Sequence, residues 1–137
     1  MGPGRLTVAY WCVLAAGALP YACAYLAKSG GFGKPRGEGG YDNREPRAWL
    51  AGLTDWRARA NAAQANSFEA LPLFFAAVLI AHQAGAPQTQ VDILAVLFVT
   101  LRIMYIAMYV AGLHLARSGI WALALLANIG IFLSALH

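Results

Sequence analysis

Four long runs of apolar residues, separated by polar stretches, dominate the pattern of this 137-residue chain. The first run has no charged residue and is long enough to cross a bilayer as a helix. The uncharged part of the second run has only 12 residues, so its crossing helix must include polar residues before it. The pattern predicts an all-α integral membrane protein, one four-helix bundle over residues 1–137. The expected spans are residues 6–27, 62–82, 92–113 and 119–136.

The connections between these spans carry turn and cap signals. Residues 28–54 are rich in glycine and charge, which predicts a basic loop. A helix is expected to resume after this loop, with Thr54 and Asp55 as candidates for its N-cap. Short turns are expected at "HQAGAPQTQ", where Gly85 and Pro87 are stop signals, and at "HLARSG".

Composition and charge agree with a membrane protein. The chain is 60% hydrophobic and 12% charged, whereas soluble domains are nearer half apolar and a quarter charged. Seven of the ten Lys and Arg residues lie between Lys28 and Arg59. The positive-inside rule therefore predicts that the basic loop faces the cytoplasm and anionic membrane lipid, with both termini outside. In a membrane protein such clustering does not indicate nucleic acid, and no nucleic-acid partner is expected.

Three other kinds of site do not fit the sequence. "GGFGKPRGEGG" is not a phosphate-binding loop, because Pro35 follows the lysine where that loop needs Ser or Thr. The three histidines are too scattered to converge on a metal ion, so no metal site is expected. Cys12 and Cys23 lie roughly 16 Å apart on one helix. They are too distant to form a disulfide, which favours a packing role.

Two charged residues lie well inside the expected spans, away from the span ends: Glu69 in the second and Arg102 in the third. A charge inside a membrane helix costs roughly 2.5–3.5 kcal/mol on insertion scales. Both side chains are therefore expected to face a protein interior or a wet cavity rather than lipid.

These charges belong to two polar stripes with helical spacing. The stripes are Arg59, Ala62, Asn66 and Glu69 on one helix, and Arg102, Tyr105 and Tyr109 on another. Each stripe lies on one helix face, and the two stripes lie at matching depths. They predict one polar cleft, open to the cytoplasm, whose mixed carboxylate, amide, phenol and guanidinium groups suit a zwitterionic, peptide-like ligand.

A structural alternative explains the same residues without a ligand. Glu69 and Arg102 could pair with each other and hold the helices together, with Tyr105 and Tyr109 as packing residues. On the same view, Asn128 forms an interhelical hydrogen bond, and Asp92 is an interfacial charge or a helix cap.

The sequences "NSFEALPLF" and "RIMYIAMY" resemble the MAPEG family, membrane-associated proteins in eicosanoid and glutathione metabolism, and in particular a bacterial-type member. The family pattern is N-x-x-E-x-x-P-x-F on the second helix and R-x-x-[YH]-x-x-x-Y on the third. Here these positions are Asn66, Glu69, Pro72, Phe74, Arg102, Tyr105 and Tyr109. The resemblance extends over nearly the whole chain.

The resemblance implies a homotrimer with a cytoplasm-facing cleft between neighbouring subunits, and glutathione as the co-substrate in each cleft. It implies that Glu69 contacts the glutathione amino group and that Asn66 holds its backbone. Tyr105 and Tyr109 would line the cleft, and Arg102 belongs to the same set of candidate binding residues. For a bacterial-type member it implies an inner-membrane location.

The family's chemistry also needs a cation beside the thiol. In several members an arginine near the start of the fourth helix lowers the thiol pKa, and Arg117 with Ser118 are the candidate catalytic residues here. The sequence departs from well-studied enzymes four residues before the asparagine, where Ala62 replaces an arginine. Arg59, one turn earlier, either reaches into the cleft as a further binding residue or is a surface charge.

Two functions follow as hypotheses. The first is a MAPEG-like membrane enzyme of the glutathione transferase or peroxidase kind, which uses glutathione or a related thiol as the nucleophile on a lipophilic electrophile or peroxide. The alternative is a non-catalytic subunit of a larger membrane complex, in which Glu69 and Arg102 serve as interhelical contacts. A small transporter or lipid-binding protein is a third interpretation.

Overall fold

The computed structural model describes residues 5–136. Over this part of the chain the structure is helical, without strands. The five α-helices are α1 (Val8–Lys28), α2 (Pro46–Ala51), α3 (Trp56–Gln83), α4 (Gln88–Ala111) and α5 (His114–Leu133), and two short 3₁₀ turns are η1 (Ser29–Gly31) and η2 (Arg36–Glu38). Four of the helices are long and apolar enough to cross a membrane, which confirms the expected number of spans.

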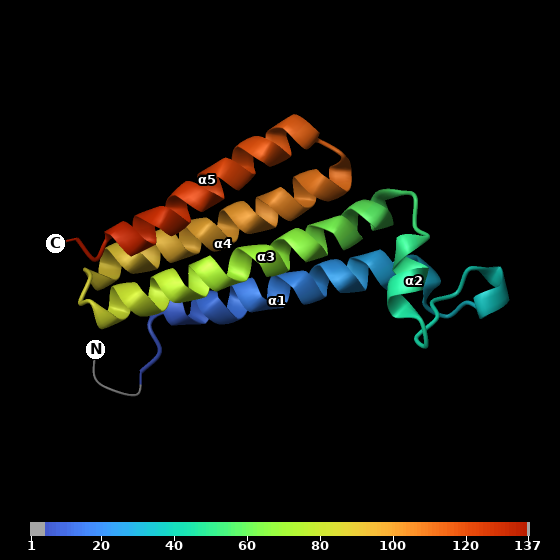
Figure 1. Ribbon diagram of the computed structural model, residues 1–137, viewed down its shortest axis with the longest axis horizontal. Coiled ribbons are helices and arrows are strands. Elements are labelled where there is room, and N and C mark those ends of the chain that lie inside the picture. The colour runs from blue at the N-terminus through green and yellow to red at the C-terminus, as the bar shows by residue number, and fades with distance from the viewer. Residues whose placement is uncertain (1–4, 137) are drawn as a thin grey trace.

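The four long helices alternate in direction and form one bundle (Figure 1). The start of α1, the α3–α4 turn and the end of α5 lie at one end. The connection that contains α2 lies at the opposite end, together with the α4–α5 turn. We call this second end the loop end. α1 packs chiefly against α3, and α4 against α5, while α3 also contacts both α4 and α5.

The first helix is capped from two directions. Thr7 is its N-cap, and the Thr7 hydroxyl oxygen accepts a hydrogen bond from the Tyr10 N–H at 3.0 Å. The Asp92 carboxylate, on α4, accepts a second one from the Ala9 N–H at 2.9 Å. Of the two roles left open for Asp92, the structure shows a cap, although for a neighbouring helix. A carboxylate at this position also interacts favourably with the positive end of the α1 dipole.

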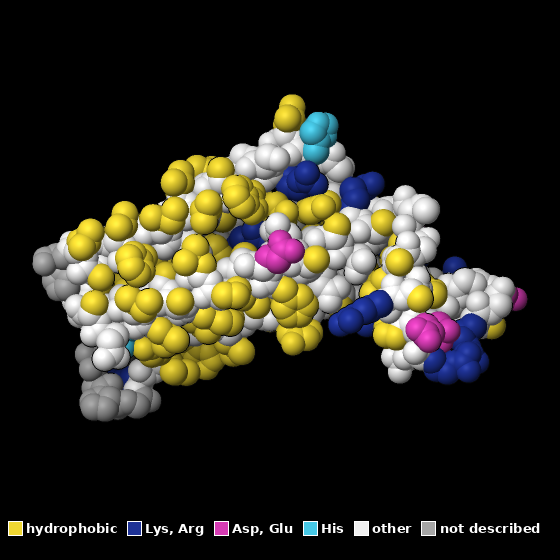
Figure 2. All heavy atoms as spheres, in the orientation of Figure 1, with side chains coloured by type: hydrophobic (Ala, Val, Ile, Leu, Met, Phe, Trp, Pro, Cys, Tyr) yellow, Lys and Arg dark blue, Asp and Glu magenta, His cyan; other side chains and the backbone are white. Residues whose placement is uncertain are grey.

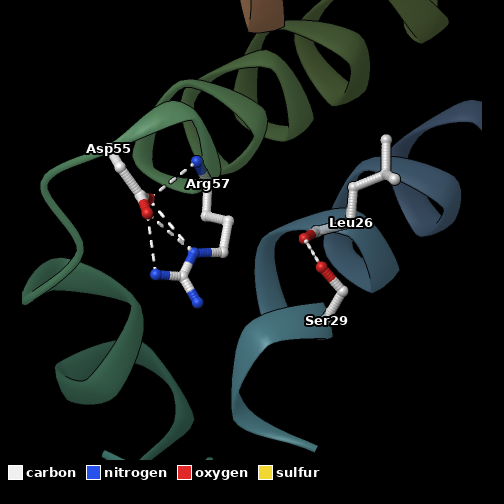
Figure 3. Close-up of polar contacts among 4 residues, drawn as sticks. All are labelled: Leu26, Ser29, Asp55 and Arg57. Carbon is white, nitrogen blue, oxygen red and sulfur yellow. Dashed lines mark hydrogen bonds and ion pairs between the residues drawn. The ribbon is translucent and has the colours of Figure 1, made fainter.

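The start of α3 is also capped by a carboxylate, which here comes from the residue just before the same helix (Figure 3). Of the two candidates that the sequence offered, Asp55 is the N-cap. Its carboxylate accepts a hydrogen bond from the Arg57 N–H at 3.0 Å. The Arg57 guanidinium pairs with the same carboxylate at 2.7 Å and thereby holds the pKa of Asp55 below its ordinary value. Nearby, the Ser29 hydroxyl donates to the Leu26 carbonyl at 2.7 Å and closes the last turn of α1.

The expected loop over residues 28–54 is wrong where α2 forms. Pro46 occupies the first helical position, where a missing N–H does no harm, and the residues after it are acceptable in a helix. The Trp49 ring of α2 packs edge-on against Tyr41 at 5.2 Å, and Tyr41 contacts Phe32 at 6.0 Å. Tertiary packing of these rings, which composition does not show, organises the connection.

The two remaining turns differ in how well the sequence predicted them. Gly85 has a φ of 75° and lies between α3 and α4, with Pro87 as the cap of α4, as expected. The expected turn at "HLARSG" is wrong, because α5 already begins at His114. Only two residues, Gly112 and Leu113, connect the helices, and Gly112, with a φ of 80°, ends α4. Arg117 and Ser118 consequently lie near the start of α5 rather than in a loop.

The core of the bundle combines one aromatic stack with many small residues. The rings of Phe74 and Phe98 stack at 4.2 Å between α3 and α4. The small core residues include Ala9, Ala16, Ala77, Ala81 and Ala95, all 0–1% exposed. Small side chains let membrane helices approach closely. Hydrophobic side chains cover most of the face of the bundle in Figure 2, as expected for a surface in contact with lipid.

Candidate functional site

Two adjoining cavities lie between α3, α4 and α5. The loop-end cavity has a volume of about 320 Å³ and is lined by Asn66, Tyr105, Tyr109, Arg117, Ser118 and Trp121. The inner cavity has a volume of about 190 Å³ and is lined by Asn66, Glu69, Ala70, Leu73, Phe98, Arg102, Trp121, Ala124, Leu125 and Asn128. Because Asn66 and Trp121 line both, the two cavities form one cleft that runs from the loop end into the apolar half of the bundle.

Arg102 is the most deeply placed charge in this cleft. Arg102 is only 3% exposed, and its guanidinium donates a hydrogen bond to the Asn66 side-chain oxygen at 2.8 Å. The same guanidinium lies 4.2 Å from the centre of the Tyr105 ring, which gives a cation–π contact. No carboxylate pairs with it among residues 5–136. The buried cation is therefore held by an amide and a ring without a compensating negative charge.

Glu69 lines the inner cavity from α3 and is exposed. Within the described residues its carboxylate has no ion pair and no hydrogen bond. Figure 2 shows acidic atoms near the middle of a largely hydrophobic face, beside a hollow in which basic atoms are visible. The ion pair between Glu69 and Arg102 that the structural alternative requires is consequently not formed in the protomer.

Two tyrosine rings lie between two arginines along the cleft wall. The Tyr105 and Tyr109 rings meet edge-to-face at 5.7 Å, both on α4. The Arg117 guanidinium lies 4.2 Å from the centre of the Tyr109 ring, so the order along the wall is Arg102, Tyr105, Tyr109, Arg117. These contacts fix the directions of two flexible arginine side chains before any ligand is bound.

Ser118 follows Arg117 on α5 and lines the loop-end cavity. Its hydroxyl donates to the His114 carbonyl one turn earlier at 3.1 Å. The hydroxyl proton is therefore committed to the helix backbone, while the oxygen remains able to accept a hydrogen bond from a ligand. The structure thus brings five of the predicted site residues, together with Arg102 and Glu69 deeper in the cleft, onto one continuous surface.

Arg59 is the predicted binding residue that lies elsewhere. It is exposed and lines neither cavity. Its guanidinium donates to the Val110 carbonyl at 3.0 Å and so satisfies a carbonyl in the last turn of α4. Ala62 also lies outside both cavity linings. Of the two roles left open for Arg59, the structure shows a contact at the loop end of the bundle and none with the cleft.

Sequence reasoning missed part of the cleft wall on α5. Arg117, Trp121, Ala124 and Asn128 follow one another at intervals of four, three and four residues, which places them on one helix face. That spacing was the available signal for Trp121. The expected interhelical hydrogen bond of Asn128 is wrong, because its side-chain oxygen is buried and has no partner among the described residues.

Together, the fold and the cleft define an integral membrane protein of four crossing helices with a polar cavity between three of them. The family comparison matches residues 8–137, and the chain belongs to the MAPEG family, which includes glutathione-using enzymes. This result confirms the resemblance inferred from the two motifs. The comparison with curated proteins and the comparison with solved structures each found no match.

Proposed function

We propose that this MAPEG protein is a membrane enzyme that uses glutathione, or a related thiol, as the nucleophile on a lipophilic electrophile or peroxide. Glutathione would act as a co-substrate in the cleft between α3, α4 and α5. The loop end would face the cytoplasm, in a bacterial inner membrane. The lipophilic substrate would reach the cleft through the lipid, where its local concentration is high.

The observation that carries this proposal is the unpaired state of two opposite charges on one cavity. The buried Arg102 guanidinium lacks a counterion, and the Glu69 carboxylate has no partner, although both line the inner cavity. A buried cation without an anion is costly. A zwitterionic ligand with a carboxylate for Arg102 and an ammonium for Glu69 would satisfy both groups at once.

The other cleft residues suggest where the chemistry takes place. A thiolate, rather than a thiol, is the nucleophile, and a neighbouring cation favours it. Arg117 is the remaining cation of the cleft and lies with Ser118 on the loop-end cavity, beside the two tyrosines. We assign thiolate stabilisation to Arg117, with Ser118 as a polar neighbour. Rate acceleration would come from positioning and electrostatic stabilisation.

We also propose that the protein assembles as a homotrimer. An unpaired carboxylate exposed at mid-bundle, such as Glu69, would cost roughly 2.5–3.5 kcal/mol if it faced lipid. A neighbouring subunit that covers this face would remove Glu69 from lipid and complete the cleft. Membrane lipid would contact the remaining hydrophobic surface.

One observation favours the alternative of a non-catalytic subunit in a larger membrane complex. Ala62 occupies the position where well-studied family members have an arginine. The nearby Arg59 donates a hydrogen bond to the Val110 carbonyl and does not line the cleft. The cleft therefore has one cation fewer than well-studied members. A complex subunit of this kind would bind no thiol.

Calorimetric titration of glutathione into the detergent-purified protein separates these two functions. We expect binding to the wild type, and at least about tenfold weaker binding to Glu69→Gln, because a charge-assisted hydrogen bond is lost. Glu38→Gln is the matched control, since Glu38 is an exposed glutamate in η2 outside both cavities. A well-folded wild type that binds no glutathione would overturn the proposal and favour the subunit.

A further inference from the structure

The far end of the inner cavity differs from the charged part of the cleft. Leu73 lies one turn beyond Glu69 on α3, and Phe98 lies one turn before Arg102 on α4, so both are roughly 6 Å deeper in the bundle. On α5, Ala124 and, one turn deeper, Asn128 line the same cavity. This part of the cavity is lined by apolar side chains with one exception.

The exception is Asn128, which is only 3% exposed. Its side-chain oxygen is buried and has no hydrogen-bond partner among residues 5–136. Ser134, the C-cap of α5 and also 3% exposed, has hydrogen-bond partners. The Ser134 hydroxyl accepts from the Gln90 side chain at 2.9 Å and donates to the Gly130 carbonyl at 2.8 Å. The bundle can thus satisfy a buried polar group nearby, but leaves Asn128 unsatisfied.

A neighbouring subunit is not a good partner for this amide. Because Asn128 is already buried within one protomer, another subunit could not contact it without entering the cavity. Leu73, Phe98 and Ala124, which line the same cavity, carry no polar side-chain atom and cannot be the partner of Asn128.

We propose that the far end of the inner cavity is a binding subsite for the lipophilic co-substrate, in which Asn128 recognises an uncharged hydroxyl or carbonyl group on an otherwise apolar chain. This inference rests on the proposed function. A side-chain amide offers both a donor and an acceptor, so it suits either group. A charged group is disfavoured, because the apolar walls would not replace its hydration.

The position of Asn128 also defines the length of the substrate. It follows Arg117 by eleven residues on α5, which separates the two along the helix by roughly 16 Å. With the thiol beside Arg117, the electrophilic centre and the hydroxyl or carbonyl group would lie near opposite ends of one extended chain. Short electrophiles could react but would not reach Asn128.

Quenching of tryptophan fluorescence by brominated lipophiles tests this subsite without catalysis or glutathione. Trp121 lines both cavities and precedes Asn128 by seven residues, roughly 10 Å along α5. An alkanol with bromine at the far end of a chain of this length would place the bromine near Trp121 when its hydroxyl meets Asn128. The probes are this bromoalkanol and the bromoalkane of the same length. The Trp121→Phe variant supplies the signal of the other tryptophans, which is subtracted.

In the wild type we expect the bromoalkanol to quench Trp121 at a roughly three- to tenfold lower concentration than the bromoalkane, the effect of one net hydrogen bond. Asn128→Leu should erase this preference, whereas the control Ser134→Ala should keep it. Because Asn128→Leu removes an unsatisfied buried amide, we expect its melting temperature not to fall.

An equal preference in wild type and Asn128→Leu, or no preference in the wild type, would overturn the subsite. Glutathione binding measured on the same samples distinguishes the two proposals. If the wild type binds glutathione but shows no preference for the alkanol, only the subsite is refuted. If the wild type binds no glutathione, the proposed function is refuted.

Discussion

Polar side chains have different surroundings in two regions of the bundle. One region is the end that holds the start of α1, which we call the α1 end, and the other is the cleft. At the α1 end, Thr7 accepts a hydrogen bond from a helix N–H, and Asp92 accepts one from the Ala9 N–H. Ser134 is bonded both to the Gln90 side chain and to a backbone carbonyl. These polar groups complete the termini of the helices, as a bundle in lipid requires.

In the cleft the corresponding bonds are missing. Arg102 has no carboxylate, Glu69 has no cation, and the Asn128 oxygen has no donor within residues 5–136. Buried polar groups at the α1 end do have hydrogen-bond partners. The lack of partners in the cleft is therefore not a general property of this bundle. This difference is what we expect if, as proposed, the cleft groups serve a ligand at the expense of stability.

The sharpest way to break this comparison is to replace Arg102 with Met. If the guanidinium serves a ligand anion, glutathione binding should weaken by about 2–5 kcal/mol, as when one partner of a buried charge pair is removed. The melting temperature should stay the same or rise, because a buried cation without a counterion is costly. Calorimetry and thermal unfolding in the same detergent measure both quantities.

Arg102→Lys is the matched control for this prediction. It keeps the charge but loses the planar fork of the guanidinium, so an intermediate affinity is expected. The opposite pattern, a large loss of stability with unchanged affinity, would show that Arg102 is a structural residue like those at the α1 end.

Replacing Asp92 with Ala tests the other half of the comparison. The Ala9 N–H and the Gln88 side-chain amide would both lose their acceptor. We expect a loss of about 1 kcal/mol in unfolding free energy, the usual effect of removing a helix cap. Glutathione affinity should change less than twofold, because Asp92 lines neither cavity.

Asp92→Asn is the conservative control, since its amide oxygen can still accept from the Ala9 N–H. Denaturant unfolding should place it between wild type and Asp92→Ala. An Asp92→Ala protein of unchanged stability that binds glutathione poorly would contradict the separation between the two regions.

The fold was largely predictable because the membrane leaves few choices. Helices must satisfy their backbone groups internally, so four apolar runs imply four spans. The polar stripes were readable for the same reason, since Glu69 and Arg102 could not face lipid. The spacing of Asn66, Tyr105 and Tyr109 with these charges then placed the cleft.

The features that the sequence did not predict depend on contacts between distant residues. The short helix α2 forms where Trp49 packs on Tyr41, in a segment whose composition indicates a loop. The early start of α5 depends on a two-residue connection in which Gly112 adopts a positive φ. Whether Arg59 reaches the cleft was undecided by spacing, because its contact is the Val110 carbonyl, 51 residues away.

The smallest expected effect concerns Asp55, a cap at the loop end that resembles those at the α1 end. Arg57 holds the pKa of Asp55 below its ordinary value of 3.8. The unfolded chain therefore takes up this proton first as the pH falls. The stabilisation by Asp55 is fully present above that ordinary value and is lost as the pH falls through the lower folded-state pKa.

Asp55→Asn isolates this contribution, because the amide keeps a cap oxygen but has no carboxylate to titrate. We expect the melting temperature of the wild type to exceed that of Asp55→Asn slightly near neutral pH, with the gap closing in acid below about pH 4. Added salt should also narrow the gap, since the Arg57 pair is partly exposed and screened. A gap that stays constant through the acid range would show that the backbone cap, rather than the ion pair, carries the stabilisation. In that case the loop end would depend on hydrogen bonds alone, as Ser134 does at the other end of the bundle.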